Sequence, residues 1–277
     1  MMRVLLPRTL QELWQILEDE PQTSLYAGGT DLLVKIRSGL IQPRHLVCLE
    51  RIVDLKKVED RGDEVFIGSC MTFTGLLRND LIKSYFPVLI KGLEVLGSPP
   101  IRNMGTVGGN IVTASPAGDT LPPLYVLGAE MELSRKDSSR RLPLKDFIKG
   151  PGQTLLGPGE VLTGIFVRRR PDFNLHHYEK VGQRRALAIA IVSLAAVINL
   201  SKDGTVKEAR LAWGSVAPTI VMSAKVEAML VGNRLSRQVL EEAAHVVRER
   251  VRPIDDMRAR SNYRRQVAGN LLLRLMM

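Results

Sequence analysis

IRNMGTVGGNIVTASPAGD, residues 101–119, is the stretch that decides the fold of this 277-residue chain. It combines three closely spaced glycines, Gly105, Gly108 and Gly109, with hydroxyl and amide side chains. Glycine opens backbone conformations that other residues avoid, and it lets a ligand reach backbone N–H groups with no Cβ in the way. The stretch therefore predicts a glycine-rich loop that holds a phosphorylated ligand. We expect Ser98-Pro99-Pro100 to enter this loop in an extended conformation.

Another glycine run lies upstream, at residues 25–31 (LYAGGTD); in chain order it is the first glycine run, and residues 101–119 contain the second. It predicts a short apolar strand, a Gly-Gly turn and a helix that continues through Leu32 to Ile36. Free amides at a helix start, with the positive end of the dipole, suit a pyrophosphate. One Gly-Gly pair is usually only a tight turn, but two such runs favour a phosphate site. Neither run has the G-x-G-x-x-G or G-K-[ST] spacing, which argues against a Rossmann fold or a triphosphatase.

Several motifs together resemble the FAD-binding medium subunit of molybdenum hydroxylases. They are the glycine runs Ala27–Asp31 and Ile101–Asp119, the segment YEKVGQRR at 178–185 with Ala188-Ile189-Ala190, and PIDDMRA at 253–259. This resemblance, which extends over essentially the whole chain, implies an α+β fold. A two-part FAD-binding domain of the vanillyl-alcohol-oxidase-like (PCMH) type would occupy residues 1–170, with subdomains at about 1–55 and 56–170. A smaller α+β C-terminal domain would follow at 171–277, after the charged stretch Arg168–Asp172.

The resemblance also implies which residues bind FAD. Ala27–Asp31 and Thr106–Asn110 would hold the pyrophosphate from two sides, largely through backbone amides. Asp119 would accept a hydrogen bond from a ribityl or ribose hydroxyl, and Leu96 and Leu162 would face the isoalloxazine or the adenine. The complete predicted set is Ala27, Gly28, Gly29, Thr30, Asp31, Leu96, Thr106, Val107, Gly108, Gly109, Asn110, Ser115, Asp119, Leu162 and Lys180.

Lys180 is the charged candidate of this set. A cation near the N1–C2=O edge would stabilise the anionic reduced flavin and raise its potential. The alternative interpretation is a solvated surface lysine. The polar candidates have a similar alternative as local caps, and the leucines as plain core residues.

No residues form an arrangement for independent substrate chemistry. The four histidines match neither a nucleophile–base pair nor a metal set, and no serine lies in G-x-S-x-G, so we predict no catalytic and no metal-binding residues. Cys48 and Cys70 lack C-x-x-C spacing, which argues against a zinc or iron–sulfur site.

The resemblance instead implies an FAD-dependent electron-transfer subunit. A molybdopterin subunit would oxidise the substrate, an iron–sulfur subunit would deliver the electrons, and the flavin would pass them to NAD, oxygen or another acceptor. Two alternatives stay open. One is a self-contained oxidase or reductase of the same flavin fold, and the other is a flavin-free basic interaction module.

Charge and hydropathy indicate which classes of partner this chain can bind. The formal net charge is +10, but the basic runs are interrupted by acidic residues and have no interleaved aromatics, so we expect an acidic protein partner and no nucleic acid. No apolar run reaches the roughly 18–20 residues that cross a bilayer, and the N-terminus lacks a signal-peptide pattern. We therefore expect a cytoplasmic protein without membrane contact.

Apolar periodicity predicts the remaining elements. The expected strands are 4–5, 24–27, 46–49, 64–68, 130–133, 160–165, 188–196 and 208–214. The expected helices are one that starts after a capping box at 9–12 and ends before Pro21, two between 69 and 97 with the second from Pro87, and two at 236–250 and 262–275.

Overall fold

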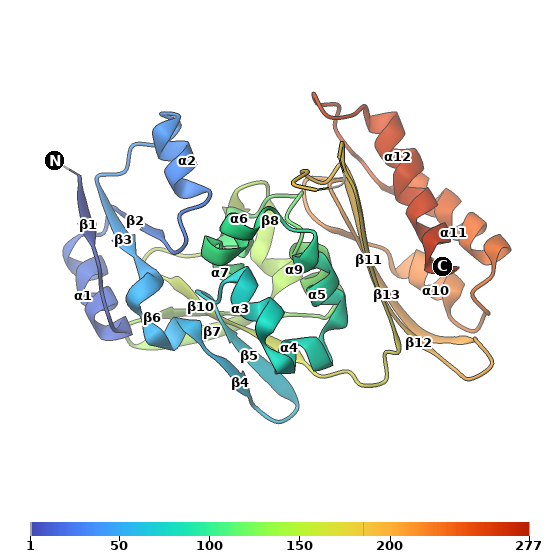
Figure 1. The fold of residues 1–277 in the computed structure, drawn as a ribbon, viewed down its shortest axis with the longest axis horizontal. Helices are drawn as coiled ribbons and strands as arrows, with labels where there is room; N and C mark the ends of the chain where they lie inside the picture. The colour runs from blue at the N-terminus through green and yellow to red at the C-terminus, as the bar shows by residue number, and fades with distance from the viewer. Residues whose placement is uncertain (1, 185, 277) are drawn as a thin grey trace.

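The computed structural model describes residues 2–184 and 186–276. Arg185, part of the motif at 178–185, and the terminal Met1 and Met277 lie outside the described residues. The described chain forms a small N-terminal sheet, a central sheet with helices, and a C-terminal sheet with helices, arranged in a row (Figure 1).

The N-terminal part is a parallel three-stranded sheet with the strand order β1-β3-β2. Its elements are β1 (Arg3–Leu5), α1 (Leu10–Asp19), β2 (Thr23–Tyr26), α2 (Leu32–Arg37) and β3 (His45–Cys48). Thr9 caps α1 by accepting a hydrogen bond from the Glu12 amide at 3.1 Å. The first strand, the first helix and the strand–turn–helix around Gly28-Gly29 therefore form as predicted.

The central part is an antiparallel five-stranded sheet with the order β4-β5-β10-β6-β7. Its strands are β4 (Val58–Asp60), β5 (Glu64–Gly68), β6 (Glu130–Arg135), β7 (Ser138–Pro143) and β10 (Val161–Arg168), and a two-stranded sheet adds β8 (Ile148–Gly150) and β9 (Gln153–Thr154). Helices α3 (Phe73–Arg78), α4 (Asp80–Tyr85), α5 (Pro87–Glu94), α6 (Pro99–Met104), α7 (Val107–Thr113), α8 (Leu121–Val126) and α9 (Leu144–Phe147) accompany it. Two 3-10 turns, η1 (Leu49–Arg51) and η2 (Val53–Lys56), lead into it from β3.

The expected extended entry and glycine-rich loop are wrong. Pro99 and Pro100 begin helix α6, since Ser98 caps it by accepting from the Ile101 amide, and proline is tolerated in the first turn, where its missing N–H would have no partner. The second glycine run itself forms helix α7, capped by Thr106. Between residues 69 and 97 three short helices form rather than the expected two, because Thr72, Asn79 and Pro87 each start a new one.

The C-terminal part is an antiparallel sheet of β11 (Leu175–Val181), β12 (Val192–Leu200), β13 (Val206–Gly214) and β14 (Val221–Met222). Helices α10 (Ala224–Leu230), α11 (Arg237–Arg250) and α12 (Ser261–Asn270), with the 3-10 turn η3 (Leu271–Met276), lie on its outer side (Figure 1). The strand expected at 188–196 runs instead from Val192 to Leu200, because the residues before it belong to a loop in which Ile189 is exposed. The helix expected at 262–275 is shared between α12 and η3.

The inner side of the C-terminal sheet packs against the central part. Tyr178, Ala195 and Ala212 belong to the same buried cluster as Leu89 of α5 and Leu124 of α8. The opposite face forms a second cluster with the C-terminal helices, in which the buried Trp213 indole donates to the Ala268 carbonyl at 3.0 Å. The C-terminal sheet is thus covered on one face by the central part and on the other by the C-terminal helices. The predicted domain division at residue 170 stays a prediction.

Candidate functional site

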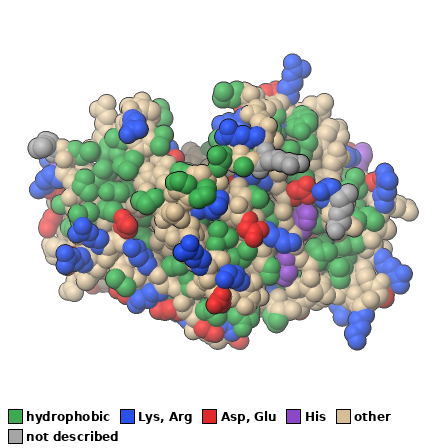
Figure 2. Space-filling view, viewed as in Figure 1, with side chains coloured by type: hydrophobic (Ala, Val, Ile, Leu, Met, Phe, Trp, Pro, Cys, Tyr) green, Lys and Arg blue, Asp and Glu red, His purple; other side chains and the backbone are tan. Residues whose placement is uncertain are grey.

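A cavity of about 440 Å³ lies where the two glycine runs face each other. This size is within the range of small-molecule and cofactor sites. The upper edge of the molecule is notched between its N-terminal and C-terminal parts, and basic and acidic side chains are interspersed over the visible face (Figure 2). The predicted residues that line the cavity are Ala27, Gly28, Gly29, Thr30, Asp31, Leu96, Thr106, Gly108, Gly109, Asn110 and Leu162. The structure therefore brings together the turn between β2 and α2, the segment after α5, the start of α7 and strand β10.

The first glycine run presents free donors to the cavity. Among the hydrogen bonds of the described residues, none is donated by the backbone amides of residues 28–32. Gly29 has a φ of +69°, a backbone conformation that is strained for a residue with a side chain. A Cβ on Gly28 would lie 1.7 Å from the Met104 carbonyl oxygen. Consecutive amides without an acceptor form the kind of concave surface that binds anions.

The second run contributes differently from what we expected. Val107 donates to the Met71 carbonyl at 3.0 Å, Gly108 to the Ser69 carbonyl at 2.8 Å, and Gly109 to the Thr106 hydroxyl at 3.2 Å. Because these amides already have acceptors, the free amides of the site come from the first run. Gly108 is needed for packing, since a Cβ there would approach Ser69 to 2.6 Å.

Two side chains beside the second run have unused hydrogen-bonding capacity. The Ser69 hydroxyl is buried, lines the cavity, and has no hydrogen-bond partner within the described part of the chain. The Asn110 Oδ1 accepts from the Thr120 hydroxyl at 2.6 Å, which fixes the amide and turns its NH₂ group elsewhere. An unpaired buried polar atom is costly, so the Ser69 hydroxyl fits a site that is completed by a ligand.

Asp119, Tyr178 and Lys180 form a buried network outside the cavity lining. The Lys180 ammonium lies 2.8 Å from Asp119 Oδ2, and the Tyr178 hydroxyl donates to Asp119 Oδ1 at 2.9 Å. The Lys180 and Asp119 side chains are only 7% and 9% exposed, so Lys180 is not a solvated surface lysine. Burial raises the pKa of Asp119, while Lys180 and Tyr178 oppose that shift.

This network lies behind one cavity wall. Lys180 also donates to the Val95 carbonyl at 2.7 Å, directly before Leu96, which lines the cavity. The described lining does not include Val107, Ser115, Asp119 or Lys180, so their predicted contacts with a cofactor stay predictions. At longer range the opposite charges of Asp119 and Lys180 cancel in part.

The sequence analysis missed several cavity residues. The most informative of them are Tyr26, Lys35, Ser69, Phe73 and Thr113. Lys35 had a local signal, since it follows Asp31 by four residues on one helix face and pairs with it at 2.7 Å. Burial and the neighbouring Cys48 raise the pKa of Tyr26 to about 12, so its hydroxyl stays neutral.

The described residues also bear on metal binding, on cysteine reactivity and on membrane insertion. Within residues 2–184 and 186–276, no three His, Cys, Asp or Glu side chains are grouped so that they could hold a metal ion. Cys48 and Cys70 are buried free thiols, and burial raises the pKa of Cys70 to about 12. No helix in this part of the chain has the length and apolar character needed to cross a membrane.

Comparisons with known proteins agree with the site. The model of the FAD binding domain in molybdopterin dehydrogenase matches residues 1–168, and that of the CO dehydrogenase flavoprotein C-terminal domain matches residues 177–277. The chain is 32% identical over 266 residues to the glyceraldehyde dehydrogenase medium chain of Sulfolobus acidocaldarius, covering 96% of this chain and 94% of that protein. It is 30% identical over 259 residues to the xanthine dehydrogenase FAD-binding subunit of Escherichia coli O157:H7, covering 92% and 88%.

Solved structures of related dehydrogenases and oxidoreductases have the same fold as this chain. A carbon monoxide dehydrogenase from Hydrogenophaga pseudoflava that lacks the Mo-pyranopterin moiety of the molybdenum cofactor superposes with a TM-score of 0.93. The identity is 27%, over 99% of this chain and 95% of that chain. Quinoline 2-oxidoreductase from Pseudomonas putida 86 also gives a TM-score of 0.93, at 25% identity, over 99% and 94%.

Proposed function

Because this chain belongs to the FAD-binding subunits of the molybdenum hydroxylase family, we propose that it transfers electrons inside a larger complex. The cofactor is FAD, and the chain is an oxidoreductase subunit. Membership of this family removes the flavin-free alternative. In the proposed reaction sequence, an iron–sulfur subunit delivers electrons that a molybdopterin subunit has taken from the substrate. NAD, oxygen or another acceptor then receives them.

The observation that carries this proposal is the cavity with its unpaired donors. The amides of residues 28–32 would hold the pyrophosphate, and the Ser69 hydroxyl and the Asn110 amide would donate to further oxygens of the cofactor. Leu96 and Leu162 would exclude water from the rings. Bound FAD would supply the reversible uptake of electrons.

The Asp119–Lys180 pair would position one side of the site. Lys180 holds the Val95 carbonyl, so the C-terminal sheet and the cavity wall at Leu96 are joined through a buried ion pair. The direct effect of Lys180 on flavin potential stays a prediction. Direct contacts of Asp119, Ser115 and Val107 with FAD likewise stay predictions.

The partner subunits follow from the nature of the family. Relatives are named as medium chains or FAD-binding subunits, which are parts of larger assemblies. We infer a cytoplasmic heterotrimer with an iron–sulfur and a molybdopterin subunit. The net charge of +10 favours partners with acidic docking surfaces.

Purification of the tagged chain from its native host tests this function. The proposal predicts two co-purifying proteins, with iron and molybdenum in the preparation and flavin reduction on addition of the substrate of the complex. Recovery of the chain alone, turning over a substrate without iron or molybdenum, would support the self-contained oxidase instead.

A further inference from the structure

Lys35 is the one basic residue among the described residues that line the cavity. The only acidic residue in that lining is Asp31, four positions earlier on the same helix face. The remaining lining side chains are neutral. FAD carries two negatively charged phosphates, so the charge of a bound pyrophosphate has a single side-chain counterion available in this lining.

The position of Lys35 is fixed by contacts that span both walls of the cavity. Its ammonium lies 2.7 Å from Asp31 Oδ2, and the Thr113 hydroxyl of α7 donates to the same oxygen at 3.1 Å. Asp31 directly follows the Gly28-Gly29-Thr30 turn, whose amides have no protein acceptor in the described chain. The Lys35 charge is therefore held between the first and second glycine runs.

The energetics favour a change of partner for Lys35. The Lys35 and Asp31 side chains are 42% and 48% exposed, and an ion pair at that exposure contributes little to stability. A charge-assisted hydrogen bond to a phosphate oxygen is stronger, particularly where the ligand displaces water. Giving up the Asp31 contact is thus a small cost compared with the gain.

We propose that Lys35 is a phosphate-binding residue of the FAD site, pre-positioned by Asp31 and transferred to the pyrophosphate when FAD binds. This inference rests on the proposed placement of FAD in the cavity. Asp31 keeps Lys35 in place in the free protein, and its own carboxylate weakens FAD binding by repulsion. Lys35 and Asp31 therefore act in opposite directions on affinity for the same ligand.

Titration of the apoprotein with three ligands tests the proposal. FAD carries both parts of the molecule, ADP carries the pyrophosphate without the flavin ring, and riboflavin carries the ring without phosphate. Lys35→Met is expected to weaken FAD and ADP about tenfold or more and to leave riboflavin unchanged. Lys35→Arg keeps the charge and is expected to restore most of the affinity for FAD and ADP. Asp31→Asn, which can still accept from Thr113, is expected to tighten both.

Lys83→Met is the matched control. Lys83 forms an i,i+3 pair with Asp80 at 3.0 Å, its side chain is 48% exposed, and it does not line the cavity. It is expected to bind all three ligands like the parent protein. Thermal melting of each apoprotein verifies folding.

The results distinguish a failure of the proposed role of Lys35 from a failure of the proposed FAD site. Unchanged FAD and ADP affinity in Lys35→Met would overturn the role of Lys35, and so would an equal loss for riboflavin, which indicates a general distortion. Absence of FAD binding to the parent protein would instead overturn the cavity assignment itself.

Discussion

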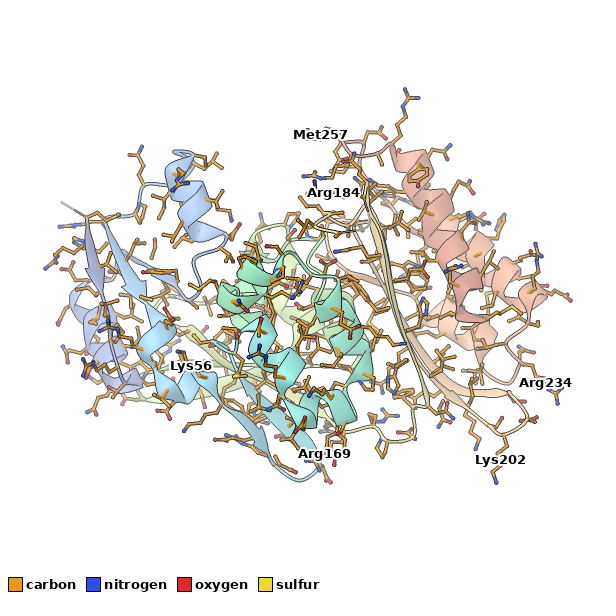
Figure 3. All side chains as sticks on the ribbon, in the orientation of Figure 1. Lys56, Arg169, Arg184, Lys202, Arg234 and Met257 are labelled. Atoms are coloured by element: carbon orange, nitrogen blue, oxygen red, sulfur yellow. The ribbon has the colours of Figure 1, made fainter. Side chains whose placement is uncertain are left out.

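Asp119 and Lys180 lie 61 positions apart in the chain and form a buried ion pair of 2.8 Å. Asp119 is the last residue of the second glycine run, and Lys180 lies on β11 of the C-terminal sheet. Arg184 and Met257 lie together at one end of the C-terminal sheet, the end at which β11 stops directly after Lys180 (Figure 3). Lys202 and Arg234 lie at the opposite end of that sheet. The pair thus joins the cavity wall to one end of that sheet.

Breaking this pair should destabilise the protein in a pH-dependent way. Lys180→Met leaves the Asp119 carboxylate buried without its cation, which costs about 3 kcal/mol in free energy of unfolding at neutral pH. Burial already raises the pKa of Asp119, and loss of Lys180 raises it further. A raised carboxyl pKa favours the folded state at low pH, so the loss should be small in acid and grow as pH rises.

Denaturant unfolding of both proteins at several pH values measures this effect. Lys57→Met removes an exposed pair with Asp54 and should show no comparable loss. A loss in Lys180→Met that does not vary with pH would contradict a role for the Asp119 charge.

Gly109→Ala should separate binding from folding. Gly109 lines the cavity, and a Cβ there would meet only the Thr106 hydroxyl, at 3.0 Å. Alanine favours the helix, so stability should not fall, whereas the added methyl group should weaken FAD several-fold. Substitutions at Gly28 or Gly108 are less informative, because a Cβ at either position would collide with the protein itself.

Gly75→Ala is the control for this experiment. Gly75 occupies the same position in α3, donating to its capping Thr72 hydroxyl at 3.0 Å, and it lies outside the cavity lining. FAD titration measures the affinity of both variants, and thermal melting measures their stability. Equal FAD affinity in the two variants would exclude Gly109 from the contact surface.

Ser69→Ala should raise stability and lower affinity. The Ser69 hydroxyl is buried without a partner in the described chain, so its removal abolishes a desolvation cost in the apoprotein. The same change removes a donor from the cavity, and FAD affinity should fall a few-fold. Melting of the apoprotein and FAD titration give both quantities. An unchanged affinity would mean that FAD does not reach this hydroxyl.

The glycine runs could be located from the sequence because their chemistry is local. The turn at Gly28-Gly29 and helix α2 form as expected, and the cavity contains most of the predicted residues. The need for glycine at position 108 could not be predicted from the local sequence, because its close neighbour Ser69, directly after strand β5, lies almost forty positions away in the chain. The contacts of Asp31 with Thr113 and of Asp119 with Lys180 likewise depend on tertiary packing.

The errors in the fold have similar causes. Strand β12 is a nearly continuous apolar run, and β13 ends in the buried apolar residues Leu211, Ala212 and Trp213; both strands are predicted in substance. Strand β11 was missed because its side chains are mostly polar and only half-buried, apart from Tyr178. The apolar residue Ile189 was assigned to the strand at 188–196, but it is 54% exposed. Apolar character alone does not distinguish a core strand from an exposed loop.

Acid should weaken the C-terminal loop through Asp256. Burial opposes ionisation there, but the Arg258 and Ala259 amides and the Arg264 guanidinium lower the pKa of Asp256 to about 2. Stability from this carboxylate is therefore present above its unfolded pKa, near 4, and is lost as pH falls toward 2. The difference in unfolding free energy between the parent and Asp256→Asn should shrink over that window. A constant difference would contradict the assignment.

Amide hydrogen exchange with and without FAD tests the central claim most directly, since it reports on the backbone groups assigned to the pyrophosphate. The amides of residues 28–32, which donate to no acceptor in the described chain, should exchange rapidly in the apoprotein and become strongly protected with FAD. The amides of residues 107–110, already bonded within the protein, should change much less. Protection confined to other regions, with residues 28–32 still exchanging rapidly in the FAD-bound protein, would contradict the assignment of this cavity to the cofactor.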